Sequence, residues 1–378
     1  MEKLDRVMKL LEMLDLQGWL IACVEDSDIH SAYLLGIRAH SRHFLLIDAG
    51  GNHVILATRM EASMIENATT GWSGTVKVLA PGSYKEMNER LEKLLHGKKI
   101  ALNYGEKSFH GDTAFADYLR AGQLQSLHEI APTCQFVSSK ELLFNLRASK
   151  TKGEHKALEK AVKITIEVLE SLPSKVKLGM SEKEVQALIH YEYMKIGEPS
   201  FETIVASGYN SADPHHNSTG KKIKKGPLLV DTGIRVDGIS SDITWTYYMG
   251  GEPPEPFTRA YNALLEAKNV ARQYMKAGEC TRIPSIKCRE KLASLDYDHE
   301  TLFIHTLGHP LGYEVHDIGT RMSRTAPEDS RFPEGAIYTC EPGLYWQSKY
   351  GIRLEDDLII HEDGPRRISE VPGDPIII

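Results

Sequence analysis

The segment HTLGHPLGYEVH at residues 305–316 carries three histidines, and imidazole is the side chain that most commonly binds a metal. His305 and His309 are four residues apart, a spacing that places two ligands on one face of a helix. Pro310 argues against a helix here, because proline has no backbone N–H to donate to the preceding turn. We therefore expect strand and turn, and other ligands of a metal bound to His309 must come from elsewhere in the chain.

Carboxylic acids within apolar, strand-like segments are the candidate partners, because an unpaired charge on a buried strand is costly. They are Asp231 in LLVDTG, Asp242 in SSDITWT, Glu341 in YTCEPGLYW and Glu355 in GIRLEDD. Taken singly, each has a structural explanation, such as a turn cap at Asp231, a strand-end charge at Glu341 or solvation within the Glu355–Asp357 triplet. Together with His309 they form an oxygen-rich set with more ligands than one tetrahedral ion needs. Such a set suits two divalent ions bridged by carboxylates, with Mn²⁺, Co²⁺ and Zn²⁺ all compatible.

The helices and strands that must position these residues form two groups along the chain, with a boundary near residue 148. The whole chain has 378 residues, which is too many for one ordinary core, so two domains are expected. The first 147 residues alternate charged helical patterns with short apolar runs, and this alternation predicts an α/β domain. The predicted strands are 19–24, 44–49, 53–58 and 99–104. This half shows no cluster of catalytic residue types, and His30, His40 and His43 are interpreted as surface or packing residues.

The second half, residues 148–378, begins with a long periodic helix after the charged lead-in RASKTKGE. Further helices are predicted at 181–196, 255–276 and 284–293, and strand-like segments separate them from the histidine segment and follow it. Helices in groups and strands in groups predict an α+β domain with a mostly antiparallel sheet. The expected fold class of the whole chain is therefore α+β with two domains.

Composition excludes several classes of function. A net charge of −7 and the absence of a long basic tract argue against nucleic-acid binding, and the short KKIKKG segment at 221–226 is interpreted as a solvated loop. No apolar run approaches the roughly 20 residues that cross a membrane, and the N-terminus resembles an amphipathic helix more than a signal peptide. The cysteines are scattered without a C-x-x-C pair, which predicts free thiols in the reducing cytoplasm. They are Cys23, Cys134, Cys280, Cys288 and Cys340.

The motifs D-T-G with S-D-I-T, H-T-L-G-H with V-H, C-E-P-G and R-L-E-D-D resemble, in this order, the metal signature of the pita-bread metallopeptidases. That family includes aminopeptidase P, prolidase, methionine aminopeptidase and creatinase. SGYNSADPHH at 207–216 and the junction NLRASKTKGE resemble further family segments, so the resemblance covers nearly the whole chain. It implies a creatinase-like α/β N-terminal domain over 1–147 and a pita-bread catalytic domain with a curved antiparallel sheet over 148–378.

The resemblance also implies roles for individual residues. The metal ligands would be Asp231, Asp242, His309, Glu341 and Glu355, with Asp242 and Glu355 bridging both ions. Glu341 would also transfer protons, His316 would lie near the scissile carbonyl, and His215, His305 and Arg353 would line the substrate pocket. A packing role for His305 stays open, and Arg353 is expected to pair with either a ligand carboxylate or a substrate carboxylate. Pro310 departs from the glycine of many relatives, which affects specificity and removes no ligand.

The implied activity is hydrolysis of the peptide bond before proline with two divalent ions, Mn²⁺ favoured. The short chain favours a dipeptidase acting on Xaa-Pro, and the alternative is an aminopeptidase that removes Xaa from longer Xaa-Pro peptides. A metal-free creatinase-like enzyme and a non-catalytic binding module are less favoured, because no ligand is missing. Relatives of this family are commonly homodimers, and a homodimer is expected here.

Overall fold

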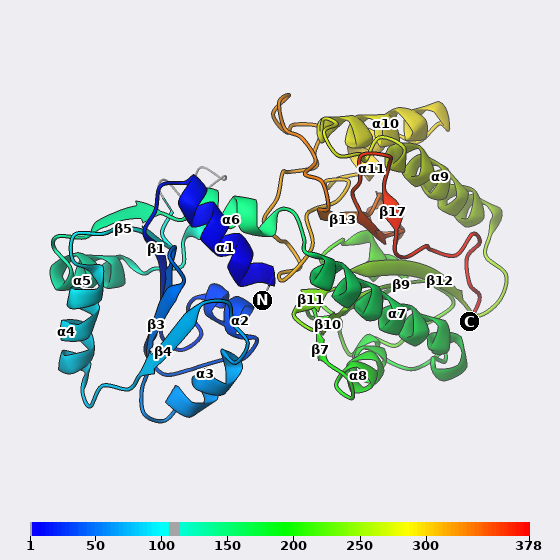
Figure 1. Ribbon diagram of the computed structural model, residues 1–378. Coiled ribbons are helices and arrows are strands. Elements are labelled where there is room, and N and C mark those ends of the chain that lie inside the picture. Colours follow the sequence, from blue (N-terminus) through cyan, green and yellow to red (C-terminus); the bar gives the residue numbers. More distant parts are fainter. Residues whose placement is uncertain (1, 106–113) are drawn as a thin grey trace. The chain divides into compact units, whose positions relative to one another are not determined.

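The computed structural model of the protein describes residues 2–105 and 114–378. The chain divides into two compact units, Met1–Arg147 and Ala148–Ile378 (Figure 1). Each unit has its own hydrophobic core. Among the described residues, no helix is both long enough and apolar enough to cross a membrane.

The N-terminal unit is built on a six-stranded mixed sheet with the strand order β4-β3-β2-β1-β5-β6. Its elements are α1 (Glu2–Met13), β1 (Gly18–Cys23), α2 (Ile29–Leu35), β2 (His43–Asp48), β3 (Asn52–Leu56), α3 (Ala62–Ala68), β4 (Thr75–Leu79), α4 (Tyr84–Leu95), β5 (Lys99–Leu102), the 3-10 helix η2 (Ala114–Ala116), α5 (Ala121–Ile130), β6 (Gln135–Ser138) and α6 (Lys140–Arg147). β1 pairs antiparallel with β2 and parallel with β5. The four predicted strands correspond to β1, β2, β3 and β5. β4 and β6 escaped prediction because they are only partly buried and mix polar with apolar residues.

The C-terminal unit consists of small antiparallel sheets and the helices that cover them. Its elements are α7 (Lys152–Lys175), α8 (Glu182–Tyr193), β7 (Glu198–Pro199), β8 (Ile204–Ser207), the 3-10 helix η3 (Gly208–Ala212), β9 (Gly226–Thr232), β10 (Ile234–Val236), β11 (Ile239–Ser240), β12 (Ile243–Met249), α9 (Glu255–Arg272), α10 (Arg282–Ser294), α11 (His299–Leu302), β13 (Ile337–Cys340), β14 (Gly343–Trp346), β15 (Tyr350–Arg353), β16 (Asp356–Ile359) and β17 (Arg366–Arg367). The main sheets are β12-β9-β8 and β13-β16-β17, and β14 pairs with β15. All of these pairings are antiparallel, as the sequence predicts for this half.

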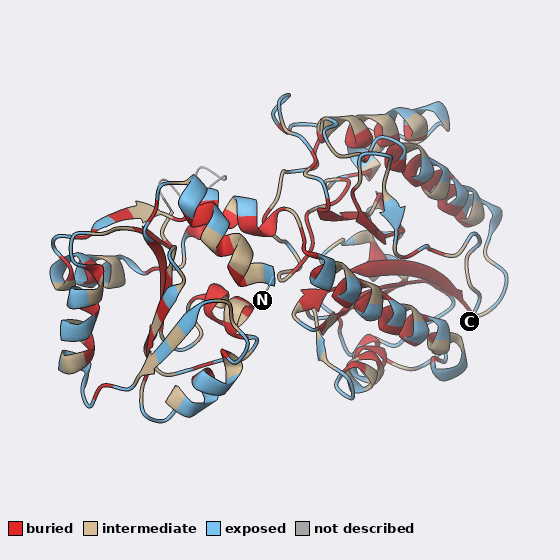
Figure 2. Cartoon of the chain, viewed as in Figure 1, coloured by how far each residue is buried: buried red, intermediate tan, exposed pale blue. Residues whose placement is uncertain are grey.

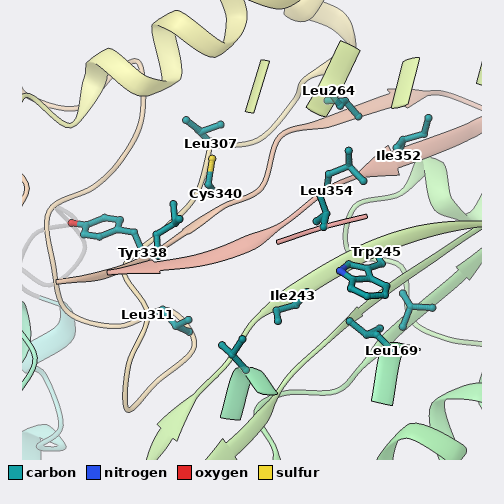
Figure 3. Close-up of a cluster of buried hydrophobic side chains, with 14 of the residues drawn as sticks. Leu169, Ile243, Trp245, Leu264, Leu307, Leu311, Tyr338, Cys340, Ile352 and Leu354 are labelled. Atoms are coloured by element: carbon teal, nitrogen blue, oxygen red, sulfur yellow. The ribbon is translucent and has the colours of Figure 1, made fainter. Parts of the chain in front are cut away.

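The long helix α7 begins at a capping box, which explains why the helical pattern starts after the charged lead-in. Thr151 Oγ1 accepts from Glu154 N at 3.2 Å, and Glu154 Oε2 accepts from Thr151 N at 2.8 Å. Its apolar face packs through Leu169 near Ile243 and Trp245 of β12 (Figure 3).

Strands β9 and β12 are buried along their whole length (Figure 2). Apolar side chains such as Leu264, Leu307 and Ile352 belong to the same core (Figure 3). A charged residue inside these strands therefore requires a compensating partner.

Candidate active site

Four strand ends of the C-terminal unit converge at one place. Asp231 is the next-to-last residue of β9, and its neighbour across the ladder is Thr244 of β12, two residues after Asp242. Glu341 directly follows β13 and Glu355 directly precedes β16. Because β13 and β16 pair antiparallel with Cys340 opposite Asp356, these two glutamates come next to each other beyond the ladder. The backbone N–H of Glu355 donates to Thr244 O at 3.1 Å and joins the two sheets.

The histidine segment is not helical, as the sequence predicts, but the expected strand is reduced to one isolated antiparallel bridge between Pro310 and Tyr338, and the rest of the segment is irregular. It runs beside β13, where Thr339 N donates to His309 O at 3.0 Å and Glu341 N donates to Leu307 O at 2.8 Å. A Cβ atom on Gly308 would lie 2.3 Å from Thr339 O. Glycine at 308 is therefore needed for the close approach that places His309 against the sheet.

All nine residues that the sequence analysis singled out line one cavity of about 700 Å³ in the C-terminal unit. They are His215, Asp231, Asp242, His305, His309, His316, Glu341, Arg353 and Glu355. The apolar side chains of Phe201, Ile204, Pro310, Val315 and Met322 also line the cavity.

Three of the candidate ligands lie within reach of a single ion. One ligand atom each of Asp242, His309 and Glu355 lie within 4.8 Å of one another. His309 Nε2 is 3.4 Å from Asp242 Oδ2 and 3.7 Å from Glu341 Oε1. The other ring nitrogen, Nδ1, lies 3.0 Å from Pro310 O, and donation to this carbonyl leaves Nε2 as a bare nitrogen that faces the carboxylates.

The electrostatics of this cluster are compatible with a bound cation. Burial and the neighbouring carboxylates raise the pKa values of Asp242 and Glu355 well above their ordinary range. Burial also raises the pKa of Glu341 to about 8, although Arg353 opposes the rise. Asp231 Oδ1 is buried and has no hydrogen-bond partner among the described residues. Divalent cations fit this set of groups, which combines mutually repelling carboxylates, one carboxylate oxygen without a hydrogen-bond partner and one unprotonated imidazole nitrogen.

Arg353 neutralises one of these carboxylates. Its Nη2 donates to Asp231 Oδ2 at 2.6 Å, its Nε donates to Thr244 Oγ1 at 3.1 Å, and its Nη1 donates to the Tyr345 hydroxyl at 3.0 Å. The Tyr345 hydroxyl also lies 2.9 Å from His305 Nε2. Tyr345 therefore connects His305 to Arg353, and sequence reasoning missed it because an aromatic residue in a buried strand looks like packing.

His305 and His316 lie beside the candidate ligands, and both are neutral at pH 7. The rings of His309 and His316 meet edge to face with centroids 4.2 Å apart. Burial and the positive field of His215 lower the pKa of His316, and burial and Arg353 lower the pKa of His305 to about 3. His305 and His316 are therefore neutral at pH 7 and can each donate one hydrogen bond.

The acidic triplet that ends at Asp357 is fully buried, so the expectation that one of its members could be solvated was wrong. Asp356 is paired with Lys268 and, at 2.9 Å, with Arg272, both on α9. Asp357 Oδ2 accepts from the backbone N–H of Asp242 at 3.0 Å. Asp357 therefore holds the backbone at Asp242, and Asp356, next to Glu355, ties its strand to α9.

A second buried acid organises the loop that carries His215. Glu182 accepts from Ser207 N at 2.9 Å, from Asn210 Nδ2 at 2.8 Å and from Thr219 Oγ1 at 2.8 Å, and it lies 2.9 Å from His216 Nε2. Burial would raise the pKa of Glu182, but these hydrogen bonds outweigh it and lower the pKa to about 2. Sequence reasoning missed Glu182, because the capping box at the start of α8 uses its neighbours Ser181 and Glu184 and an acid in the first turn of a helix does not point to a long-range partner.

Known proteins resemble both the sequence and the fold. The sequence model of metallopeptidase family M24 matches residues 156–362. The Xaa-Pro dipeptidase of Pyrococcus furiosus is 32% identical over 255 residues, which make up 67% of this chain and 72% of that protein. The solved X-Pro aminopeptidase of Thermotoga maritima superposes with a TM-score of 0.84 at 25% identity, over 97% of this chain and 99% of that one. The solved Xaa-Pro dipeptidase of Bacillus anthracis superposes with a TM-score of 0.83 at 25% identity, over 100% of this chain and 99% of that one.

These likenesses extend over both units, so the predicted α+β fold with two domains is confirmed, and it is the fold of prolidases and aminopeptidase P. The family match spans more than half of the chain and includes every candidate metal ligand. The predicted class of enzyme, a metallopeptidase, is confirmed as well. The chain belongs to metallopeptidase family M24.

Proposed function

We propose that the cavity of the C-terminal unit hydrolyses the peptide bond that precedes proline and that Xaa-Pro dipeptides are its preferred substrates. The observation that carries the proposal is the convergence of Asp242, His309, Glu341 and Glu355 with His316 on one cavity. The names of the Pyrococcus and Bacillus relatives support the choice of substrate.

The five proposed metal ligands are Asp231, Asp242, His309, Glu341 and Glu355. Two divalent ions held there, Mn²⁺ before Co²⁺ or Zn²⁺, would activate a water molecule and polarise the substrate carbonyl. Asp242, His309 and Glu355 would together hold one of these ions, because one ligand atom of each lies within 4.8 Å of the others. The Thr244 hydroxyl donates to Glu355 Oε2 at 2.7 Å, and the backbone N–H of Asp242 donates to Asp357 Oδ2 at 3.0 Å, so both acids are held in place before any ion binds.

The protein's own groups would handle the protons. Glu341 would accept a proton from the attacking water at its carboxylate and pass it to the leaving nitrogen, which carries no hydrogen in an Xaa-Pro bond. His316, neutral at pH 7, would donate its N–H to the carbonyl oxygen as negative charge develops there. The apolar side chains of Val315 and Met322 offer a surface for the pyrrolidine ring.

Our choice of a dipeptidase over an aminopeptidase depends on Arg321. It lines the same cavity and is exposed, and its guanidinium makes no hydrogen bond or ion pair with the rest of the described chain. Arg353, by contrast, is already committed to Asp231. We therefore propose that Arg321 binds the free carboxylate of the dipeptide. Replacement by glutamine should raise KM for Ala-Pro about tenfold; Arg331→Gln, at an exposed arginine that does not line the cavity, serves as the matched control.

The test of the whole proposal is hydrolysis of Ala-Pro and Ala-Pro-Ala by Mn²⁺-loaded protein, with EDTA-treated protein as the control. Cleavage of Ala-Pro alone, stopped by EDTA, supports a dipeptidase. Cleavage of Ala-Pro-Ala moves the assignment to an aminopeptidase, whose fold the Thermotoga enzyme shares. Failure to cleave either peptide would contradict the proline specificity.

A further inference from the structure

A second cavity lies inside the N-terminal unit, at the end of its hydrophobic core. It has a volume of about 220 Å³ and lies between strands β1 and β2 and helices α4 and α5. Ala22 of β1 faces Phe44 of β2 across the ladder, and both belong to the core that the two helices cover. Small residues on both sides, Ala22 on the sheet and Gly122 and Ser126 on α5, leave the space open. Among the described residues, those that line this cavity and those that line the candidate active site do not overlap.

Most of the cavity wall is apolar. Val24 and Phe44 line it from the strands, and Leu127 and Ile130 line it from α5. A ligand here must have an apolar part, because burying apolar surface against such a wall is favourable. Drug-sized ligands occupy about 300–1,000 Å³, so this cavity suits a smaller molecule and excludes a nucleotide or a peptide.

Two polar groups in the wall are not fully satisfied by hydrogen bonds or ion pairs within the described chain. Arg42 makes no hydrogen bond or ion pair there, and its guanidinium lies 4.5 Å from the ring centroid of Tyr84. Asn88 lines the cavity from α4, and its Oδ1 atom is buried and accepts no hydrogen bond. A buried acceptor without a donor costs about 1–3 kcal/mol unless a ligand or water satisfies it. Arg42 therefore offers a cation for an anion and Asn88 an acceptor for an N–H group, beside the polar side chains of Gln123 and Ser126.

We propose that this cavity binds a free α-amino acid with an apolar side chain. Its carboxylate would receive the forked N–H groups of Arg42, its ammonium would donate to Asn88 Oδ1, and its side chain would fill the space beside Ala22. Amino acids are also the products of peptide hydrolysis. Under the proposed function the site would therefore be positioned to sense product, but the binding itself does not depend on that function.

The test is calorimetric titration of the full-length, EDTA-treated protein with L-leucine, without peptide substrate. Two analogues separate the proposed contacts: L-leucinamide lacks the carboxylate, and 4-methylpentanoate lacks the ammonium. Binding of L-leucine with each analogue at least tenfold weaker supports the proposal. Equal binding of leucine and either analogue, or no binding of leucine, overturns it. These arms need no variant and do not require the protein to cleave any peptide.

Variants locate the binding. Arg42→Met and Asn88→Leu should each weaken leucine binding at least tenfold, and Ala22→Leu should block it by filling the cavity. Arg90→Met is the matched control, because Arg90 lies on α4 but is paired with Glu86. Peptidase activity at low product concentration should stay unchanged in all of these variants. Leucine binding that survives in Arg42→Met but disappears in His316→Ala would place the ligand in the catalytic cavity and overturn the proposal.

Discussion

Each unit of the protein buries a cluster of histidine and acidic side chains, and the two clusters differ in how their charges are balanced. In the N-terminal unit, Asp28 lies 2.9 Å from His30 Nδ1 and accepts from Asn103 Nδ2 at 2.7 Å. Arg147 Nη1 lies 3.0 Å from His30 Nε2. Opposite charges and complementary donors alternate along this network, which is what a buried polar cluster needs to stabilise a fold.

The C-terminal cluster breaks this rule. Asp242, Glu341 and Glu355 face one another with raised pKa values, and Asp231 keeps an orphan oxygen despite its bond to Arg353. A network that is incomplete without a cation is costly to the fold alone. The comparison teaches that burial and residue type do not separate a structural cluster from a functional one, whereas the balance of charge does.

The largest effect is expected from a substitution that disrupts the C-terminal cluster. Glu341→Gln removes both a proposed ligand and the group that transfers protons, so kcat on Ala-Pro should fall by about 10³-fold or more. Steady-state kinetics with Mn²⁺ measures this loss, and circular dichroism checks that the fold is kept. Exposed Glu362→Gln is the matched control. Wild-type turnover in Glu341→Gln would refute the assigned role.

The next largest effect is expected from a substitution that disrupts the N-terminal cluster. Asn103 also accepts from Trp19 Nε1 and from Ser139 Oγ, both at 2.7 Å. Asn103→Leu leaves these donors and the Asp28 carboxylate without their partner, so the free energy of unfolding should fall by about 3 kcal/mol. Urea denaturation measures it, with exposed Asn67→Leu as the control. Activity per folded molecule should be retained, and a loss of kcat with unchanged stability would mean that the N-terminal network is functional as well.

The contrast also shows how far the sequence leads. The ligand candidates could be identified because acids in buried strands are conspicuous, and because residues such as Asp231 and Glu355 lie in local motifs. The path of the segment around His309 could not, because its geometry depends on hydrogen bonds to β13, a tertiary contact. The burial of Asp356 was hidden for the same reason, since its cation partner Lys268 lies on a distant helix.

A smaller effect tests whether balanced charge marks a structural group within the C-terminal unit as well. Glu182 lies in the C-terminal unit but is satisfied like the N-terminal network, and its pKa is lowered from 4.5 to about 2. A carboxyl with a lowered pKa contributes stability above its unfolded pKa and loses it as the pH falls through the folded value. Glu182→Gln should therefore cost about 2 kcal/mol at pH 6, and the difference from wild type should shrink between pH 4.5 and 2.

Urea denaturation of both proteins across this pH range measures the Glu182 effect. Exposed Glu184 has a similarly lowered pKa from its capping box, so Glu184→Gln controls for a surface acid. A difference between wild type and Glu182→Gln that stays constant down to pH 2 would show that the carboxylate charge contributes nothing.

The smallest expected effect discriminates best, because the sign of the change in stability distinguishes the two clusters. Asp242→Asn removes one of the mutually repelling carboxylates, so the metal-free variant should be more stable than metal-free wild type by about 1 kcal/mol. Mn²⁺ should raise the Tm of wild type and leave that of the variant nearly unchanged, since a ligand has been lost. Differential scanning calorimetry in EDTA and in Mn²⁺ gives both numbers, and exposed Asp237→Asn is the control. A variant less stable than wild type in EDTA would mean that Asp242 stabilises the fold as Asp28 does, and the distinction between the clusters would fail.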